Sequence, residues 1–283
     1  MATSENMGRN MKEKLESLLK LTPREEKEAE KERKNFEKGA EKDLQKMCAQ
    51  NPIRPFFKQN FIGKRVASFF ENLYLNRASY CFQNENHNKA PKYLERAFRW
   101  NPNSAAAWYG MALISRSKDA YLRMIRELTC VLHLMPENVE ALMMRSSVFQ
   151  MKKKYVAALA DLFTCIRLDM KNAELWYLAG TLYWRMDENK KAIQFLTQST
   201  LLAPLDIHMW QLLALNYEEM DNNESAYSCY RIIMALQEAQ FGKDFTKTLN
   251  LATQEIPILQ EMQAACLPIE TEARTENGNG TDT

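Results

Sequence analysis

An unbroken period of 34 residues runs through the middle of this chain and limits the folds that it can adopt. The place of Tyr74 recurs as Trp108, Leu142, Trp176 and Trp210, with no insertion or deletion between them. A small residue, a mostly leucine place and a mostly proline place keep the same step. They are Ala78, Ala112, Ser146, Gly180 and Ala214; Leu94, Leu128, Leu162, Leu196 and Tyr230; and Pro102, Pro136, Met170, Pro204 and Glu238. Such a chain folds as a stack of similar units.

Each block is predicted to form two amphipathic helices. In both halves of a block the apolar residues recur at steps of three and four, which places them on one face of a helix. The small residue lets the two helices cross closely, and the closing proline ends the second helix. Pro91 lies near the start of the second helix of the first block. We therefore expect that helix to begin late or to bend.

These spacings resemble the tetratricopeptide repeat, a helix-turn-helix unit with Trp, Gly/Ala, Tyr, Ala, Phe/Leu, Ala and Pro at the corresponding places. The resemblance covers residues 71–240 as five repeats. Their predicted bounds are 71–104, 105–138, 139–172, 173–206 and 207–240. The resemblance implies an all-α fold, a right-handed α-solenoid of about five tandem repeats with helical caps.

The chain outside the repeats divides into five predicted segments. They are an N-terminal segment that is partly helical or disordered (1–22), a charged helix (23–50), an aromatic and basic capping segment (51–70), a C-terminal capping helix (241–266) and a disordered tail (267–283). The aromatic segment is predicted to cover the apolar edge of the first repeat. The tail is rich in Thr, Glu, Asn and Gly, a composition that does not support a packed core.

The charged helix has a strong start signal, with Thr22 as N-cap, Pro23 at the first helical position and Glu25 completing a capping box. Only its second half is predicted to dock on another element, through Phe36, Ala40, Leu44 and Met47. Six lysines step along it by three or four residues: Lys27, Lys31, Lys34, Lys38, Lys42 and Lys46. This stripe is typical of a solvated face, and a site for an acidic partner is the alternative.

Composition indicates a soluble intracellular protein. The net charge is only +2, 46% of the residues are hydrophobic, and no apolar run approaches the length of a membrane span. The first residues lack the apolar core of a signal peptide, so we expect the cytoplasm, with the nucleus as the alternative. Four of the six cysteines fall at packing positions of predicted helices, and no Cys/His spacing indicates a metal site. We therefore expect no metal and no cofactor.

The resemblance implies that the first helix of each repeat lines a concave groove in which a peptide or helix of another protein binds. At the groove-facing places this sequence has aromatic and aliphatic residues edged by both signs of charge. The predicted partner-binding residues are Tyr109, Leu113, Arg116, Met143, Glu174, Tyr177, Thr181, Trp184, His208 and Gln211. Such a lining suits an apolar or amphipathic segment of a partner, and nucleic acid is not expected.

One branch of the family binds acidic chaperone tails through a two-carboxylate clamp of Lys, Asn, Asn, Lys and Arg. The corresponding places here hold Leu75, Ser79, Gly110, Glu140 and Met144, so the clamp is absent. Fingerprints of hydrolases, nucleotide-binding loops and dinucleotide folds are also absent from the sequence. The prediction is a non-catalytic scaffold or adaptor. The alternatives are an obligate structural subunit of a larger complex, or a co-chaperone that lacks the clamp.

Overall fold

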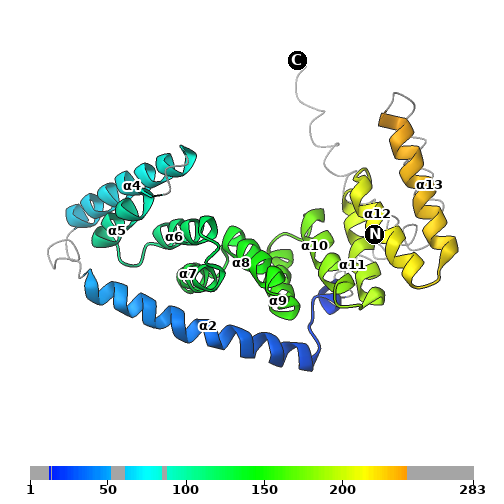
Figure 1. Cartoon of the computed structure of the whole chain (residues 1–283), viewed down its shortest axis with the longest axis horizontal. Helices are drawn as coiled ribbons and strands as arrows, with labels where there is room; N and C mark the ends of the chain where they lie inside the picture. The colour runs from blue at the N-terminus through cyan, green and yellow to red at the C-terminus, as the bar shows by residue number, and fades with distance from the viewer. Residues whose placement is uncertain (1–12, 14, 52–60, 85–87, 241–283) are drawn as a thin grey trace, which may run out of the picture. The chain divides into compact units, whose positions relative to one another are not determined.

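The computed structural model describes residues 13, 15–51, 61–84 and 88–240, which fold as helices with no strand among them. Contacts divide the chain into two compact units. The first unit comprises Pro23–Leu168, and the second comprises the chain from Asp169 onward together with the residues before Pro23. Each unit is therefore described by itself, and Figure 1 labels the helices of both.

Among its described residues, the first unit holds three helix pairs and one long additional helix. The additional helix is α2 (Pro23–Gln50). The pairs are α4 (Phe61–Gln83) with α5 (Ala90–Trp100), α6 (Ala105–Ser117) with α7 (Tyr121–Leu134), and α8 (Val139–Met151) with α9 (Tyr155–Leu168). The second unit pairs α10 (Ala173–Trp184) with α11 (Asn189–Leu202), and α12 (Ile207–Glu219) with α13 (Asn223–Gln240). We call the two members of each pair its first and second helix.

The connections between helices repeat at the same 34-residue step. Four first helices begin at a side chain that accepts a hydrogen bond from a backbone N–H of the first turn: Ser104, Asn138, Asn172 and Asp206. The turns inside four pairs each contain one residue of positive φ, between 53° and 59°: Asp119, Lys153, Asp187 and Asp221. Three of these four are Asp, which tolerates the left-handed region better than most residues. Local capping and turn chemistry thus follow the repeat.

The repeated aromatic and leucine positions lie in the core of the helix pairs, except at Tyr74 in the first pair and Tyr230 in the last, which are partly accessible or exposed. Trp176, Trp210 and Leu196 are fully or almost fully buried. The indole Nε1 of Trp176 donates to the carbonyl oxygen of Met170 at 2.9 Å, and that of Trp210 donates to Pro204 at the same distance. Each of these two first helices is thereby tied to the residues that precede it.

Proline positions explain where the first pair departs from the others. The helix α5 has 11 residues, whereas α7, α9 and α11 have 14, and Pro91 lies in its first turn. The late start that Pro91 predicts is therefore confirmed. The sequence suggested a boundary between residues 70 and 71, but α4 runs through it from Phe61. No proline lies between residues 61 and 90, so nothing interrupts the helix there.

Four predicted segments lie partly or wholly outside the described residues. Most of residues 1–22, the N-terminal half of 51–70 and everything from residue 241 onward belong to this group. The proposed caps and the proposed disordered tail therefore stay predictions.

Candidate functional site

The ten predicted partner-binding residues all lie on first helices, but in two separate sets. Tyr109, Leu113 and Arg116 lie on α6 and Met143 lies on α8, all within the first unit. The second unit holds the other six, on α10 and α12: Glu174, Tyr177, Thr181, Trp184, His208 and Gln211. Each set forms the first-helix surface of its own unit, and the single continuous groove stays a prediction.

The first-helix surface of the first unit combines half-buried apolar groups with charged groups. Tyr109, Leu113 and Met143 are each partly accessible, and Arg116 is exposed. Partial burial raises the pKa of the Tyr109 phenol; the carboxylate of Glu140 raises it further, and the guanidinium of Arg116 opposes the shift. The phenol is therefore neutral near pH 7 and can both donate and accept a hydrogen bond.

In the second unit, Trp184 is held in one orientation by a neighbouring helix. Its indole Nε1 donates to both carboxylate oxygens of Glu219 at 3.0 Å, and Asn189 donates to the same carboxylate at 3.1 Å. Tyr177 and Trp184 are half-buried. Thr181 donates its hydroxyl to the carbonyl of Tyr177 at 2.9 Å, so that hydroxyl can only accept from a partner. Trp184 and Thr181 thus have defined hydrogen-bond partners within the second unit.

Glu219 is a residue that sequence reasoning missed. It ends α12 and is exposed, so its position in the sequence resembles that of any charged residue at a helix end. The residue lies 35 places after Trp184, one more than the repeat step. The available signal was an acidic residue one place beyond the position that corresponds to Trp184 in the next repeat. The three polar residues Glu174, His208 and Gln211 are exposed on the same two helices.

The opposite side of the second and third pairs is covered by α2, which packs against the second helices α7 and α9 (Figure 1). Ala40 is completely buried there, and its carbonyl oxygen accepts from the thiol of Cys130 at 3.6 Å. The Phe36 ring meets Phe149 edge-on with centroids 6.0 Å apart. The second half of α2 therefore docks as its apolar stripe predicts.

The expectation that only the second half of α2 docks is wrong. Arg33 pairs with the fully buried carboxylate of Asp161 on α9, and Glu32 accepts from Lys154 at 3.0 Å. Ala29 is buried as well. The first half docks mainly through ion pairs, which an apolar periodicity cannot reveal. The six lysines of the stripe are all exposed, as a solvated face requires.

Asp161 is the centre of this charged seam. Arg145 on α8 donates to both of its oxygens at 2.8 Å and also to the Thr129 hydroxyl at 3.2 Å. Two guanidinium groups therefore share one buried carboxylate, and they come from α2 and α8. Such a network fixes how three elements pack, because each buried charge depends on the others.

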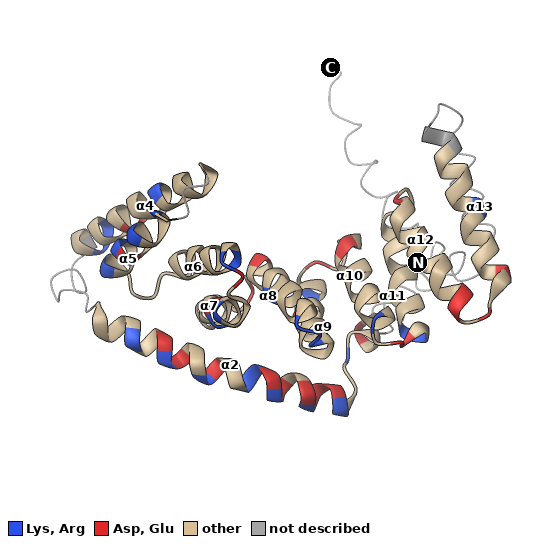
Figure 2. Ribbon diagram, in the orientation of Figure 1, with Lys and Arg blue, Asp and Glu red and all other residues tan. Residues whose placement is uncertain are grey.

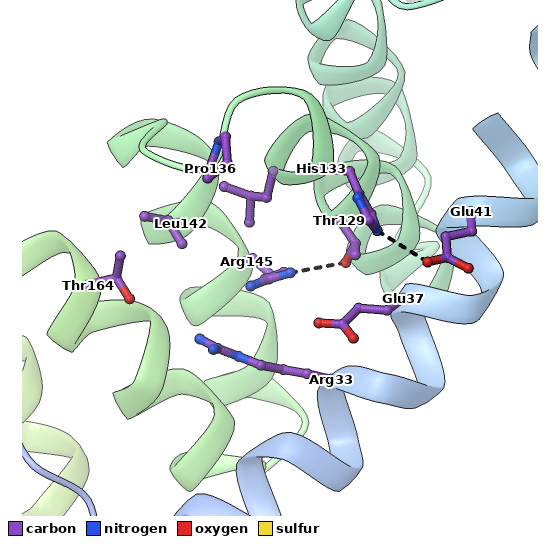
Figure 3. Close-up of a pocket in the computed structure, with 10 residues that line it drawn as sticks. Arg33, Glu37, Glu41, Thr129, His133, Pro136, Leu142, Arg145 and Thr164 are labelled. Atoms are coloured by element: carbon purple, nitrogen blue, oxygen red, sulfur yellow. Dashed lines mark hydrogen bonds and ion pairs between the residues drawn. The ribbon is translucent and has the colours of Figure 1, made fainter.

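A hollow of about 450 Å³ opens beside this seam, between α2 and the helices α7, α8 and α9. Figure 3 shows the charged side chains of Arg33, Glu37 and Glu41 directed from α2 toward Arg145 and His133. The nearest oxygen of Glu41 lies 3.9 Å from His133 Nε2. Guanidinium and carboxylate groups thus line the hollow together, and Arg145 donates to Asp161 and Thr129. The arrangement joins α2 to the repeats.

Three buried cysteines among the described residues are poorly reactive. Burial raises the pKa of the thiols of Cys130, Cys165 and Cys229 to about 12, so they stay protonated and are poor nucleophiles. In the part of the chain that the structure describes, no three His, Cys, Asp or Glu side chains gather as metal ligands would. Over the same residues, no helix combines the length and apolar character needed to cross a membrane.

Comparisons with known proteins agree on the repeat. The family model described as "Tetratricopeptide repeat" matches residues 71–104 and 173–204. A solved structure of MamA from Desulfovibrio magneticus RS-1, from residue 41 to its end, has a TM-score of 0.55 and 24% identity, covering 60% of this chain and 97% of that chain. A MamA RS-1 ArsTM double mutant has a TM-score of 0.56 and 22% identity, covering 62% and 98%. No match was found among the curated proteins.

At these identities the likeness to MamA carries the fold alone. The fold is all-α and of the tetratricopeptide solenoid class, and the two matched segments coincide with the first and fourth blocks of the 34-residue period. The number of repeats, five by their spacing, stays a prediction. The period, the helix pairs and the family match agree, and the chain contains tetratricopeptide repeats at residues 71–104 and 173–204.

Proposed function

We propose that this protein is a non-catalytic adaptor that binds an apolar or amphipathic segment of a partner on its first-helix surfaces. The observation that carries the proposal is the contrast between two sides of the second and third pairs. The helix α2 packs on α7 and α9, whereas Tyr109, Leu113 and Met143 on α6 and α8 stay partly accessible. Half-exposed aromatic and aliphatic side chains with polar neighbours are typical of the centre of a protein interface.

The chemistry of these surfaces favours an amphipathic partner helix or an extended apolar peptide. Tyr177 and Trp184 offer large apolar areas on α10, and Trp184 is already oriented by Glu219. Little side-chain entropy would then be lost on binding. Glu174, His208 and Gln211 are exposed on the same helices and could fix the register of the bound segment. An acidic chaperone tail fits poorly, because the clamp residues are absent.

The proposal is tested by removing the two aromatic side chains together. Partners of the tagged wild-type chain, of Tyr177→Ala/Trp184→Ala and of a matched control, Lys38→Ala on the exposed stripe of α2, would be purified from the protein's own cells. Quantitative mass spectrometry should show one partner set in the wild type and the control that is lost in the double variant. Because Trp184 bonds to Glu219, a Trp184→Phe variant separates the loss of that bond from the loss of the aromatic surface.

Identical partner sets in all samples would contradict the proposal, because binding would then not use α10. A partner lost only with Lys38→Ala would instead favour the alternative of an acidic partner on α2. Each captured protein would be purified and titrated against the wild type and the double variant. Direct binding must weaken by about tenfold or more if the pair forms the centre of the interface.

A further inference from the structure

The first helix of the first pair exposes a stripe of large apolar side chains. Ile62, Phe69, Leu73 and Tyr80 on α4 are 73%, 65%, 36% and 67% exposed. Their steps of seven, four and seven residues place them along one line of the helix. Scattered single apolar residues are ordinary on a protein surface, but four in one line form a continuous apolar edge.

The repeat register shows what this line does elsewhere in the chain. The residues that correspond to Leu73 and Tyr80 are buried in α6, α8 and α12: Ala107 and Ile114, Ala141 and Val148, Met209 and Asn216. Each of these three helices packs against the second helix of the pair before it. The stripe on α4 is therefore the surface with which a first helix receives a preceding pair.

The second helix of the last pair exposes the matching surface. Tyr227, Tyr230 and Met234 on α13 are 67%, 39% and 60% exposed. The corresponding residues of α7 are all buried: Ile125, Leu128 and Leu132. Since α7 packs against the following first helix α8, these places normally receive the next pair. In α11, the residues that correspond to Tyr230 and Met234 are likewise buried.

Terminal units of repeat proteins usually carry a polar outer face, which keeps the stack soluble and ends it. Both end pairs of this chain depart from that rule, with seven large apolar side chains on α4 and α13. The first helix of one end and the second helix of the other thus present complementary halves of the contact that joins neighbouring pairs. A surface of this kind extends a stack.

The two end pairs also carry opposite charge. Residues 61–100 contain seven Lys and Arg against three acids, whereas residues 207–240 contain five acids against one Arg. Figure 2 shows the blue residues on α4 and α5 and the red ones around the turn between α12 and α13. Opposite charge steers unlike surfaces together and disfavours pairing of like ends. Pairing of α4 with a second α4 would bring two basic surfaces together.

We propose that copies of this chain associate head to tail, with α13 of one copy docking on the exposed stripe of α4 of the next. The contact between copies reproduces the contact that α7 makes with α8, and α11 with α12, within one copy. It is a heterologous contact, in which different surfaces of the two copies meet, so association continues beyond the dimer until a ring closes or the copies run out. The first-helix surfaces of the proposed function take no part in it.

Single charges placed on the two edges test this polarity. Phe69→Asp blocks α4, Met234→Asp blocks α13, and both residues are exposed, so neither change disturbs a core. The full-length wild type should show an average mass that rises with concentration past that of a dimer in sedimentation velocity. Each variant alone should be monomeric, with self-association weakened by about tenfold or more. An equimolar mixture of the two should form dimers and nothing larger, because one intact α4 and one intact α13 remain.

The control is Leu122→Asp, which charges an equally exposed apolar residue, 62% accessible, on the interior helix α7. It should associate like the wild type, and so should Tyr177→Ala/Trp184→Ala, which separates this proposal from the adaptor proposal. Tyr80→Asp and Tyr227→Asp provide a second pair of edge variants, and circular dichroism checks that every variant is folded.

A wild type that stays monomeric at every concentration would overturn the proposal. If a chain ending at residue 240 associates where the full chain does not, the C-terminal residues occupy α13 instead of a second copy. Unchanged association of Phe69→Asp and Tyr80→Asp would also overturn it, as would a mixture of blocked variants that stays monomeric while the wild type associates.

Discussion

The two sides of the second and third helix pairs are used differently. On the side of the second helices, α2 buries Ala40 and shares the carboxylate of Asp161 with Arg145 through Arg33. On the side of the first helices, Tyr109 and Met143 remain partly accessible. The additional helix α2 therefore covers the second-helix side, and it does not fill the first-helix surface.

This difference shows that α2 covers the second-helix side of the scaffold and leaves apolar side chains accessible on the first-helix side. The same chain covers its second helices with α2 through the buried thiol of Cys130 on α7 and the ion pair of Arg33 with Asp161 on α9, and α2 also meets Phe149 on α8. Its contact with α8 is at Phe149, whereas Tyr109, Leu113 and Met143 on α6 and α8 stay partly accessible. The comparison is broken if residues on the open side prove to be structural, or if α2 proves dispensable for the packing of the other side.

The largest expected effect separates two neighbours on α10. Trp176 is 1% exposed, packs on Phe195 and bonds to the Met170 carbonyl, so Trp176→Ala should lower the free energy of unfolding by about 3–5 kcal/mol. Tyr177 is half-buried, so Tyr177→Ala should cost less than about 1 kcal/mol. Urea unfolding followed by circular dichroism measures both. Equal losses would place Tyr177 in the core and remove it from the first-helix surface.

The next effect tests the charged seam on the covered side. Asp161→Ala leaves the Arg145 side chain, 8% exposed, without its counter-charge, and should cost about 3 kcal/mol. The loss stays at the lower end of the range for buried pairs because Arg33 is 28% exposed and can reach water. Denaturant unfolding of Asp161→Ala, Arg145→Leu and the double variant forms the cycle. If the double variant loses as much as the sum of the singles, the two residues are not coupled.

The sequence predicted those features that repeat and missed those that join the repeats to something else. The 34-residue register placed Trp176 and Leu196 in the core, and Pro91 explained the short helix α5. The pairing of Arg33 with Asp161 spans 128 residues and has no periodicity, so no local pattern announces it. Glu219 was missed for the same reason. The sequence also did not predict the exposed apolar side chains of α4 and α13, because a repeated position is buried only where a neighbouring pair packs on it.

A smaller effect tests whether α2 docks as a unit. Ala40 is completely buried against α7, so Ala40→Asp would move a carboxylate out of water into a packed contact, and α2 should detach. We expect a loss of about 2 kcal/mol and faster protease cleavage within residues 23–50. Lys38→Asp, two residues away on the exposed stripe, is the matched control and should leave cleavage unchanged. Equal protection of both variants would show that the covered side does not depend on this contact.

The smallest effect concerns a buried acid that joins α6 and α7. Glu127 is 4% exposed and contacts Ser115 and Arg123; burial raises the pKa of its carboxyl, although these two hydrogen bonds oppose the shift. Because the folded-state pKa lies above the unfolded one, this group contributes stability that is complete below about pH 4.5 and is lost as the pH rises through the folded-state value. The neutral amide in Glu127→Gln should therefore raise the free energy of unfolding above that of the wild type most strongly at neutral pH. This difference in stability should shrink as the pH falls. Unfolding free energies of the two proteins across that pH range measure the difference. An advantage that grows toward low pH would mean that the bonds to Arg123 and Ser115 outweigh burial, and that this polar contact between the two helices stabilises the ionised acid.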